Sequence, residues 1–271
     1  MKGSEFVATY GKQPLFAWEA AALALAESGG LLVAPLREVP VSSSDGKTTG
    51  AVLVTGDVLA LGEPGDLLRL PLTPGTAQAV ANSLGGALLP TRKIVRHAWM
   101  AATKRMTPHP LSPNRGANLA QYKEHSDIVG QELLMAGAEP SDMVSGIKKD
   151  VVIARDVPAG KVAIYGWIGP DGKAIQPLST VHSAGYVDYS HGIRFVAPTM
   201  RVDGEGEVAT EAAYADPRLS ALVSDEGPIK TTRYPATIAP QPSRFTFTRL
   251  LVQGLQALVF YASSNGGRLL A

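Results

Sequence analysis

The stretch from 180 to 194, TVHSAGYVDYSHGIR, gathers more groups that can do chemistry than any other part of the chain. It holds His182, Asp188, Ser190 and His191 together with two tyrosines and an arginine. Histidine and aspartate can move protons or bind a metal, and serine can attack a substrate when a base lies beside it. This stretch is therefore the candidate site.

The spacing of these residues demands a reversal of the chain. Along a straight strand His182, Tyr186, Asp188 and Ser190 share one face, because side chains alternate with a period of two. His182 and Asp188 would then lie roughly 20 Å apart, at about 3.3 Å per residue, which is too far to share a metal or a hydrogen bond. Residues 183–185, Ser-Ala-Gly, are typical of a turn, so the sequence predicts that the chain folds back there.

Once the chain folds back, three kinds of chemistry become available. A zinc-like divalent metal with a hydrolytic water could be held by His182, Asp188 and His191. Ser190 could instead be a nucleophile with His182 as its base, or a histidine and a tyrosine could be the base and acid of a lyase. The catalytic candidates are His182, Tyr186, Asp188, Ser190, His191 and Arg194, the last of these to neutralise negative charge. The substrate-binding candidates are Tyr165, Trp167, Tyr189 and Lys149.

Two interpretations without catalysis stay open. The segment could be ordinary core, with Asp188 capping a turn and His191 hydrogen-bonded in place, since buried polar groups in sheets are usually structural. It could also belong to a non-catalytic module that binds a glycan or a protein through aromatic side chains. The platform of such a module would consist of Tyr165, Trp167, Tyr186 and Tyr189.

Composition limits the class of protein. The chain has 271 residues, 45% of them hydrophobic and 18% charged, which predicts a packed globular protein. Its 25 basic and 24 acidic residues give no excess of charge for nucleic acid or an anionic membrane. It has no cysteine, which excludes thiol catalysis, cysteine-ligated metals and disulfides. The apolar stretch at 15–26 is too short to span a bilayer.

The elements that must position the site follow from periodicity and from helix and turn signals. The sequence predicts an α+β fold, with a mixed or antiparallel sheet of short strands flanked by helices. Helices are expected over 15–27, 76–84, 91–105, 118–135 and 210–223. Strands are expected over 31–41, 51–61 and 67–72, and the main sheet is expected from residue 151 onward, where short β-like runs follow one another.

The expected organisation is one domain with additions at its ends. Residues 1–6 resemble cloning residues, 7–234 form a single α+β domain, and 235–271 form a strand-containing appendage packed on that domain. A native leader is expected to have been removed, so a secreted or periplasmic location is favoured and a cytoplasmic one stays open. Outside the candidate segment, His97, His109 and His125 are expected at the surface. The pair at 148–149 is expected to be a solvated helix end, although Asp150 could bring Lys149 to the sheet edge.

Several segments resemble a family of often exported bacterial proteins whose activity is not established. They are KKDVVI (148–153), KVAIYGW (161–167), IQPLSTVH (175–182), YVDYSHGIR (186–194) and LSALVSDEG (219–227), and YVDYSHG is the most specific of them. A looser resemblance links 182–185, HSAG, to zinc D-Ala-D-Ala peptidases. Asp188 comes one residue early for that motif, which in a strand turns the carboxylate to the other face.

Taken with the resemblance, the residues favour a bacterial hydrolase acting on a cell-envelope or environmental polymer, with its site on 182–194 and with or without a divalent metal. A non-catalytic binding module and a polysaccharide lyase are the alternatives.

Overall fold

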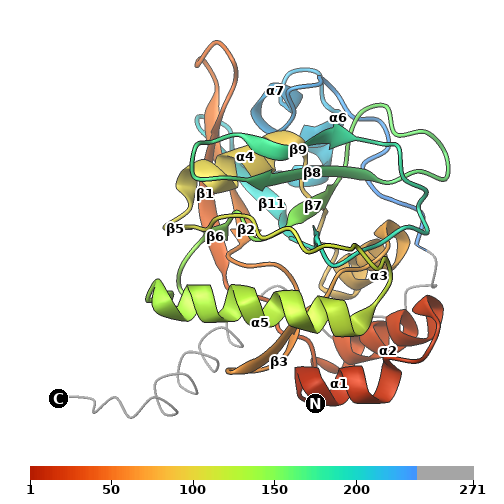
Figure 1. Ribbon diagram of the computed structural model, residues 1–271. Coiled ribbons are helices and arrows are strands. Elements are labelled where there is room, and N and C mark those ends of the chain that lie inside the picture. Colours follow the sequence, from red (N-terminus) through yellow and green to blue (C-terminus); the bar gives the residue numbers. More distant parts are fainter. Residues whose placement is uncertain (237–271) are drawn as a thin grey trace.

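The computed structural model describes residues 1–236 and builds an α+β fold from them (Figure 1). Its helices are α1 (Gly3–Tyr10), α2 (Leu15–Ser28), α3 (Pro74–Ser83), α4 (Arg92–Ala101), α5 (Leu119–Met135), α6 (Thr210–Ala215) and α7 (Ser220–Val223). Its strands are β1 (Leu36–Ser42), β2 (Thr49–Thr55), β3 (Ala60–Glu63), β4 (Asp66–Arg69), β5 (Lys104–Arg105), β6 (Val144–Ser145), β7 (Lys149–Val152), β8 (Ala163–Ile168), β9 (Ala174–Ser179), β10 (His191–Gly192), β11 (Val196–Val202) and β12 (Gly206–Ala209).

Eight of the described strands form two four-stranded sheets. One has the order β1-β2-β11-β12 and is antiparallel throughout. The other has the order β10-β7-β8-β9, with β10 parallel to β7 and the remaining pairs antiparallel. The predicted fold class is therefore confirmed. The short β-like runs expected from residue 151 onward supply most of the second sheet.

The helices hold the second sheet from two sides. In Figure 1, α1, α2 and α5 lie below the sheets, while α4 packs on both β1 and β8. The largest core cluster joins side chains from the lower helices to the second sheet, and includes Trp18, Tyr122, Trp167 and Phe195. The site segment therefore rests on a continuous core rather than on a separate lobe.

Local signals explain where the predicted helices begin and end. The helix predicted over 15–27 is α2, and Gly29 closes it in a left-handed conformation with φ of 77°. Thr91 accepts a hydrogen bond from the Ile94 amide and starts α4. Asn118 starts α5 in the same way. The helix predicted over 210–223 is divided instead into α6 and α7, because Pro217 disfavours helical backbone at the residue before it.

The first six residues pack against the domain, and their origin as cloning residues stays a prediction. Phe6 on α1 is fully buried in the largest core cluster. The Ser4 amide donates to an Asp66 carboxylate oxygen at 2.9 Å. Gly3 lies so close to β4 that an added Cβ would meet the Asp66 carbonyl oxygen at 2.9 Å. The N-terminal helix is therefore an integral part of the domain.

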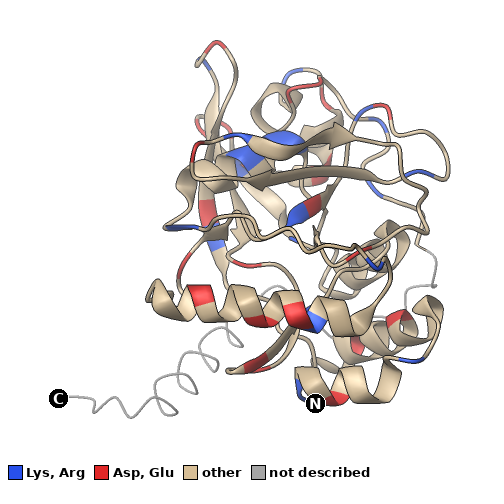
Figure 2. Cartoon of the chain, viewed as in Figure 1, with Lys and Arg blue, Asp and Glu red and all other residues tan. Residues whose placement is uncertain are grey.

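Charged residues are interspersed over the described chain, as the adjoining blue and red positions of β7 illustrate in Figure 2. The arrangement agrees with the balanced composition. Within residues 1–236 no helix combines the length and the apolar character needed to cross a membrane.

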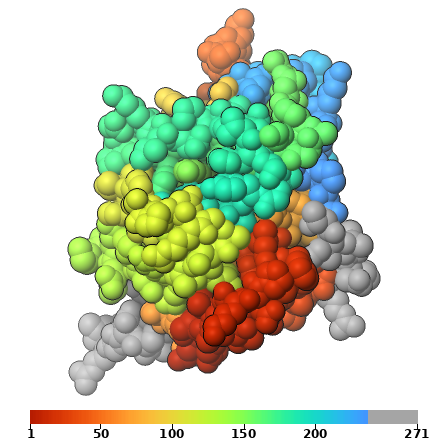
Figure 3. All heavy atoms as spheres, turned by 45° about the vertical axis from the view of Figure 1, so that its right-hand side comes forward, coloured from red at the N-terminus to blue at the C-terminus, as the bar shows by residue number. Residues whose placement is uncertain are grey.

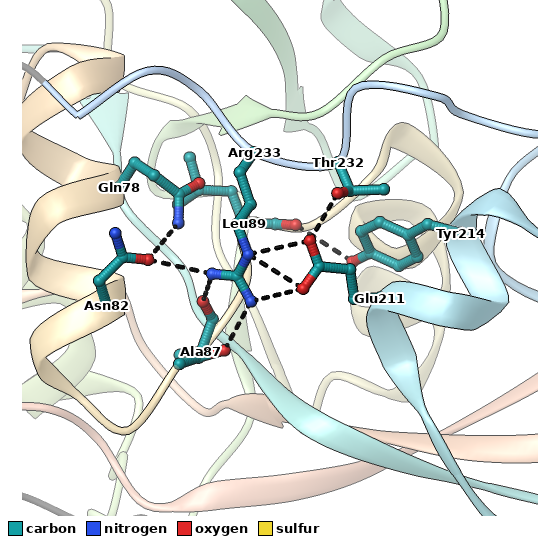
Figure 4. A network of polar contacts seen from close by, with 9 residues as sticks. Gln78, Asn82, Ala87, Leu89, Glu211, Tyr214, Thr232 and Arg233 are labelled. Atoms are coloured by element: carbon teal, nitrogen blue, oxygen red, sulfur yellow. Dashed lines mark hydrogen bonds and ion pairs between the residues drawn. The ribbon is translucent and has the colours of Figure 1, made fainter.

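Arg233 ties the end of the described chain to the domain (Figure 4). Its guanidinium donates to both carboxylate oxygens of Glu211 at 2.9–3.0 Å and to the carbonyl oxygens of Gly86 and Ala87. Next to it, the Tyr234 hydroxyl donates to the Val152 carbonyl on β7. Residues 232–234 therefore belong to the domain. Of the strand-containing appendage predicted over 235–271, residues 237–271 lie outside the described residues.

Arg233→Gln should lower the free energy of unfolding by about 1–2 kcal/mol, because the charge-assisted hydrogen bonds to Glu211 and the carbonyl groups are lost together. Urea denaturation measures the change. Arg218→Gln is the matched control, since its ion pair with Asp216 is exposed and should contribute less than about 1 kcal/mol. An effect of Arg233→Gln no larger than that of the control would refute the anchoring role.

Candidate functional site

The chain reverses at residues 183–185, where the sequence predicts a turn. The Tyr186 amide donates to the Ser183 carbonyl at 2.9 Å, so the predicted turn at 183–185 is confirmed. The reversal stacks the His182 and Tyr186 rings, with centroids 4.1 Å apart and planes 10° from parallel. The first effect of the turn is thus to pair His182 with Tyr186 at the partly exposed edge of the site.

Asp188 organises the returning chain. Its Oδ2 accepts hydrogen bonds from the Tyr186 hydroxyl and from Asn114 Nδ2, both at 2.7 Å, and its Oδ1 accepts from the amide and hydroxyl of Ser190. Burial alone would raise the pKa of Asp188, but the positive charge that His191 can carry and these hydrogen bonds lower it well below its usual range. The carboxylate is therefore ionised and fully hydrogen-bonded.

Ser190 is engaged by that carboxylate and not by a histidine. Its side chain is buried, and its hydroxyl donates to Asp188. Within the described part of the chain no hydrogen bond joins Ser190 to His182. The arrangement predicted for a serine nucleophile with His182 as base is therefore not the one that the structure forms.

His191 stands beside Lys149 on the sheet. The two residues are register partners in the parallel pair of β10 and β7, and the Lys149 amide donates to the Ser190 carbonyl at 2.7 Å. Partners on neighbouring strands present their side chains on the same face. His191 is 1% exposed, and neither ring nitrogen has a hydrogen-bond partner among residues 1–236. Burial lowers the pKa of His191 to about 4, against the opposing charge of Asp188, so its imidazole is neutral at neutral pH.

The Lys149 side chain is half-buried, on the strand next to His191. Its ammonium lies 5.3 Å from the centre of the Trp167 ring, a cation–π contact. Burial lowers the pKa of Lys149, and the negative charge of Asp188 opposes this. Among residues 1–236 no carboxylate lies within ion-pair distance of this ammonium.

Lys148, its neighbour, is buried rather than solvated at a helix end. It is 3% exposed, and its ammonium donates to the Tyr189 carbonyl. Burial, and then the charge of Arg69, lowers the pKa of Lys148 to about 7. Gly192 allows this packing, because a Cβ there would meet Lys148 Cβ at 2.7 Å. The expectation of a solvated pair is therefore wrong for Lys148. Its ammonium instead holds the backbone of the site segment at Tyr189.

The backbone of β8 separates the two aromatic residues predicted to act together. Gly166 and Trp167 have φ of 118° and 53°, and the register with β9 shifts at this point. The usual alternation fails there, so Trp167 joins the core cluster next to the site while Tyr165 packs in a different cluster with Val95. The expectation that Tyr165 binds substrate is corrected for this reason.

Trp167 and Tyr189 meet a third ring beneath the site. The Tyr189 centroid lies 6.3 Å from Trp167 and 5.1 Å from the ring of His125. His125 is fully buried, so the surface position expected for it is wrong. Tyr165, Trp167 and Tyr189 are each at most 6% exposed, and the aromatic platform predicted for a binding module is accordingly not an exposed row.

The Arg194 side chain is buried and bound to the protein's own backbone and to Asp150. Its guanidinium donates to the carbonyl oxygens of Thr55 at 2.6 Å and Val144 at 2.9 Å, and it forms an ion pair with Asp150 at 3.4 Å. All of these contacts lie in the buried joint between the strands. The proposed role of Arg194 in neutralising a substrate is corrected to that of a structural clamp.

Two residues of the site escaped sequence reasoning. Asn114 belongs to the proline-rich connector before α5, and this connector lies beside the 182–191 segment (Figure 3). Hydrogen bonds join them: Asn114 Nδ2 donates to Asp188, and the Leu111 amide donates to the Tyr189 hydroxyl. Tyr122 on α5 is fully buried, and its hydroxyl has no partner among the described residues. Burial, with the nearby charge of Asp188, raises the pKa of Tyr122. The helical spacing of Tyr122, Val129 and Leu133 could have identified the buried face, whereas nothing local indicated Asn114.

The residues predicted to hold a metal do not converge. In the part of the chain that the structure describes, no group of three His, Asp or Glu side chains is placed to hold a metal ion. Both oxygens of Asp188 already accept hydrogen bonds, and the His182 ring is stacked on Tyr186. As arranged, His182, Asp188 and His191 do not fit a zinc-like ion, and the metal stays a prediction that metal analysis of the purified protein tests.

Comparisons of this chain with family models, with curated proteins and with solved structures find no match. The resemblance carried by YVDYSHG therefore stays a prediction, and the function has to be argued from the site itself.

Proposed function

We propose that this protein is a hydrolase that cleaves a polymer of the cell envelope or of the environment, with His191 as its general base. The observation that carries the proposal is the state of His191, which is buried, neutral at neutral pH and without a partner on either ring nitrogen among residues 1–236. Buried polar groups nearly always have partners, and we take the partner of the His191 imidazole in the reaction to be the attacking water or the substrate. A substrate of this kind suits a secreted or periplasmic protein.

The reaction needs one water molecule. His191 takes a proton from the water as its oxygen attacks the carbonyl carbon of an amide or ester link and a tetrahedral intermediate forms. The bond to the leaving group then breaks, and the imidazolium returns the proton to the leaving atom. Asp188, ionised and held in place by its hydrogen bonds, stabilises the imidazolium. Lys149, on the same face as His191, stabilises negative charge that develops on the substrate.

A lyase is the second candidate, because Tyr186 lies against His191. Their ring centroids are 5.8 Å apart with planes at 68°, and the tyrosine hydroxyl donates to Asp188. Burial and Asp188 raise the pKa of Tyr186 to about 12, so it carries a proton at neutral pH. In this reaction His191 removes the proton next to a sugar carboxylate, a double bond forms, and Tyr186 protonates the leaving oxygen.

Oxygen-18 labelling separates the candidates. The purified protein is incubated in ¹⁸O-water with peptidoglycan and with a panel of acidic and neutral polysaccharides. The masses of the products are then measured by mass spectrometry. Hydrolysis places one ¹⁸O atom in the product, and this is the expected result. Unlabelled, ultraviolet-absorbing unsaturated products would establish the lyase instead. Binding of a polymer with no product from any of them would refute catalysis and support the binding module.

A further inference from the structure

We infer that the partly exposed edge of this site binds a carboxylate-bearing sugar unit, with Lys149 pairing the carboxylate and the His182–Tyr186 stack covering the sugar ring. The inference rests on the proposed function and deepens it, because it names the chemical class of the substrate. Three independent features of the described residues converge on it.

The first feature is the unpaired cation. Lys149 is half-buried, its ammonium lies over the Trp167 ring, and among residues 1–236 no carboxylate lies within ion-pair distance of it. Buried charges are normally paired. Asp188 is the acidic group whose charge acts on Lys149, but its two oxygens already accept four hydrogen bonds. An incoming carboxylate supplies the missing partner, and a charge-assisted hydrogen bond forms between them.

The second feature is the ring stack at the edge. His182 and Tyr186 are both partly exposed, and their near-parallel rings make a rigid, flat surface. Such a surface suits the C–H face of a pyranose, while polar atoms around it fix the orientation of the hydroxyl groups. A free small carboxylate or an inorganic anion would leave this surface unused.

The third feature is the position of His191. It is the register partner of Lys149, so a group held by the ammonium lies next to the neutral imidazole on the same face of the sheet. Trp167, held beneath Lys149 in a left-handed conformation, fixes the floor of this arrangement. The geometry therefore places the acidic sugar unit directly beside the proposed base.

Calorimetric titration tests the inference on the whole chain. Two acidic ligands are used, tri-galacturonate and the disaccharide of N-acetylglucosamine and N-acetylmuramic acid, each compared with its uncharged methyl ester. We expect at least one acid to bind about tenfold to a hundredfold more tightly than its ester, the range of one charge-assisted hydrogen bond. Lys149→Gln should abolish this preference. Lys173→Gln, at the exposed turn between β8 and β9, is the matched control and should keep it.

The outcomes are distinguishable from those of the proposed function. Equal binding of acid and ester for both pairs, or no binding of either, would overturn the inference, and so would a preference that survives Lys149→Gln. None of these results affects hydrolysis by His191, which the labelling experiment measures on neutral polymers as well. A preference that is lost in Lys149→Gln and retained in Lys173→Gln establishes the subsite. The acid that binds more tightly shows whether the sugar unit comes from a uronic-acid polysaccharide or from peptidoglycan.

Discussion

His191→Gln should lower the turnover of the cleaved polymer by about a hundredfold to ten-thousandfold, the contribution of a positioned general base. Glutamine keeps a polar side chain of similar size, and no described residue loses a hydrogen-bond partner. The free energy of unfolding should therefore change by less than about 1 kcal/mol. The kcat/KM value and urea denaturation are measured together, with His97→Gln on α4 as the control that keeps full activity.

The pH dependence adds a second check on the same variant. Because the base must be neutral, the rate of the parent should rise as the pH increases through the His191 pKa of about 4 and stay level above it. Its folded pKa lies below the unfolded value of about 6.5, so His191 contributes stability above that value that is lost as the pH falls toward 4. His191→Gln should lack this part of the acid sensitivity. Full turnover in a variant that melts well below the parent would show that His191 is structural.

The sequence predicted the parts of this structure that depend on neighbouring residues. The helix over 15–27 and the one over 118–135 follow from residues close together in the chain, such as the closing Gly29 and the capping Asn118. The turn at 183–185 followed from distance alone, since six residues of straight strand would keep His182 and Asp188 apart. These predictions needed no knowledge of tertiary contacts.

The site departs from the predictions where distant segments meet. Lys149 faces His191 only because β10 pairs with β7, and Asn114 reaches Asp188 across 74 positions. Nothing in the local pattern of either residue carries this information. Tyr165 was misplaced because the alternation rule assumes regular backbone, and the left-handed conformation of Trp167 breaks it.

Arg194→Met should lower the free energy of unfolding by about 3–5 kcal/mol at neutral pH, because it leaves the buried Asp150 carboxylate without its cation. The carbonyl groups of Thr55 and Val144 lose their donor as well. Arg92→Met is the matched control, since its ion pair with Asp225 is partly exposed and should contribute less than about 1 kcal/mol. Urea denaturation of both variants and the parent gives the comparison.

Acidification should shrink the deficit of Arg194→Met. Burial raises the pKa of Asp150 to about 6 even with Arg194 present, and removing the guanidinium raises it further. A group with a raised folded pKa contributes stability that is complete below its unfolded value of about 3.9 and is lost as the pH rises through the folded pKa. The variant should therefore approach the parent near about pH 5, where its carboxyl is neutral. Adding Asp150→Asn should recover part of the loss at neutral pH, and the remainder measures the two carbonyl groups. A deficit that is the same at both pH values would show that those carbonyl groups, and not the unpaired carboxylate, account for the instability.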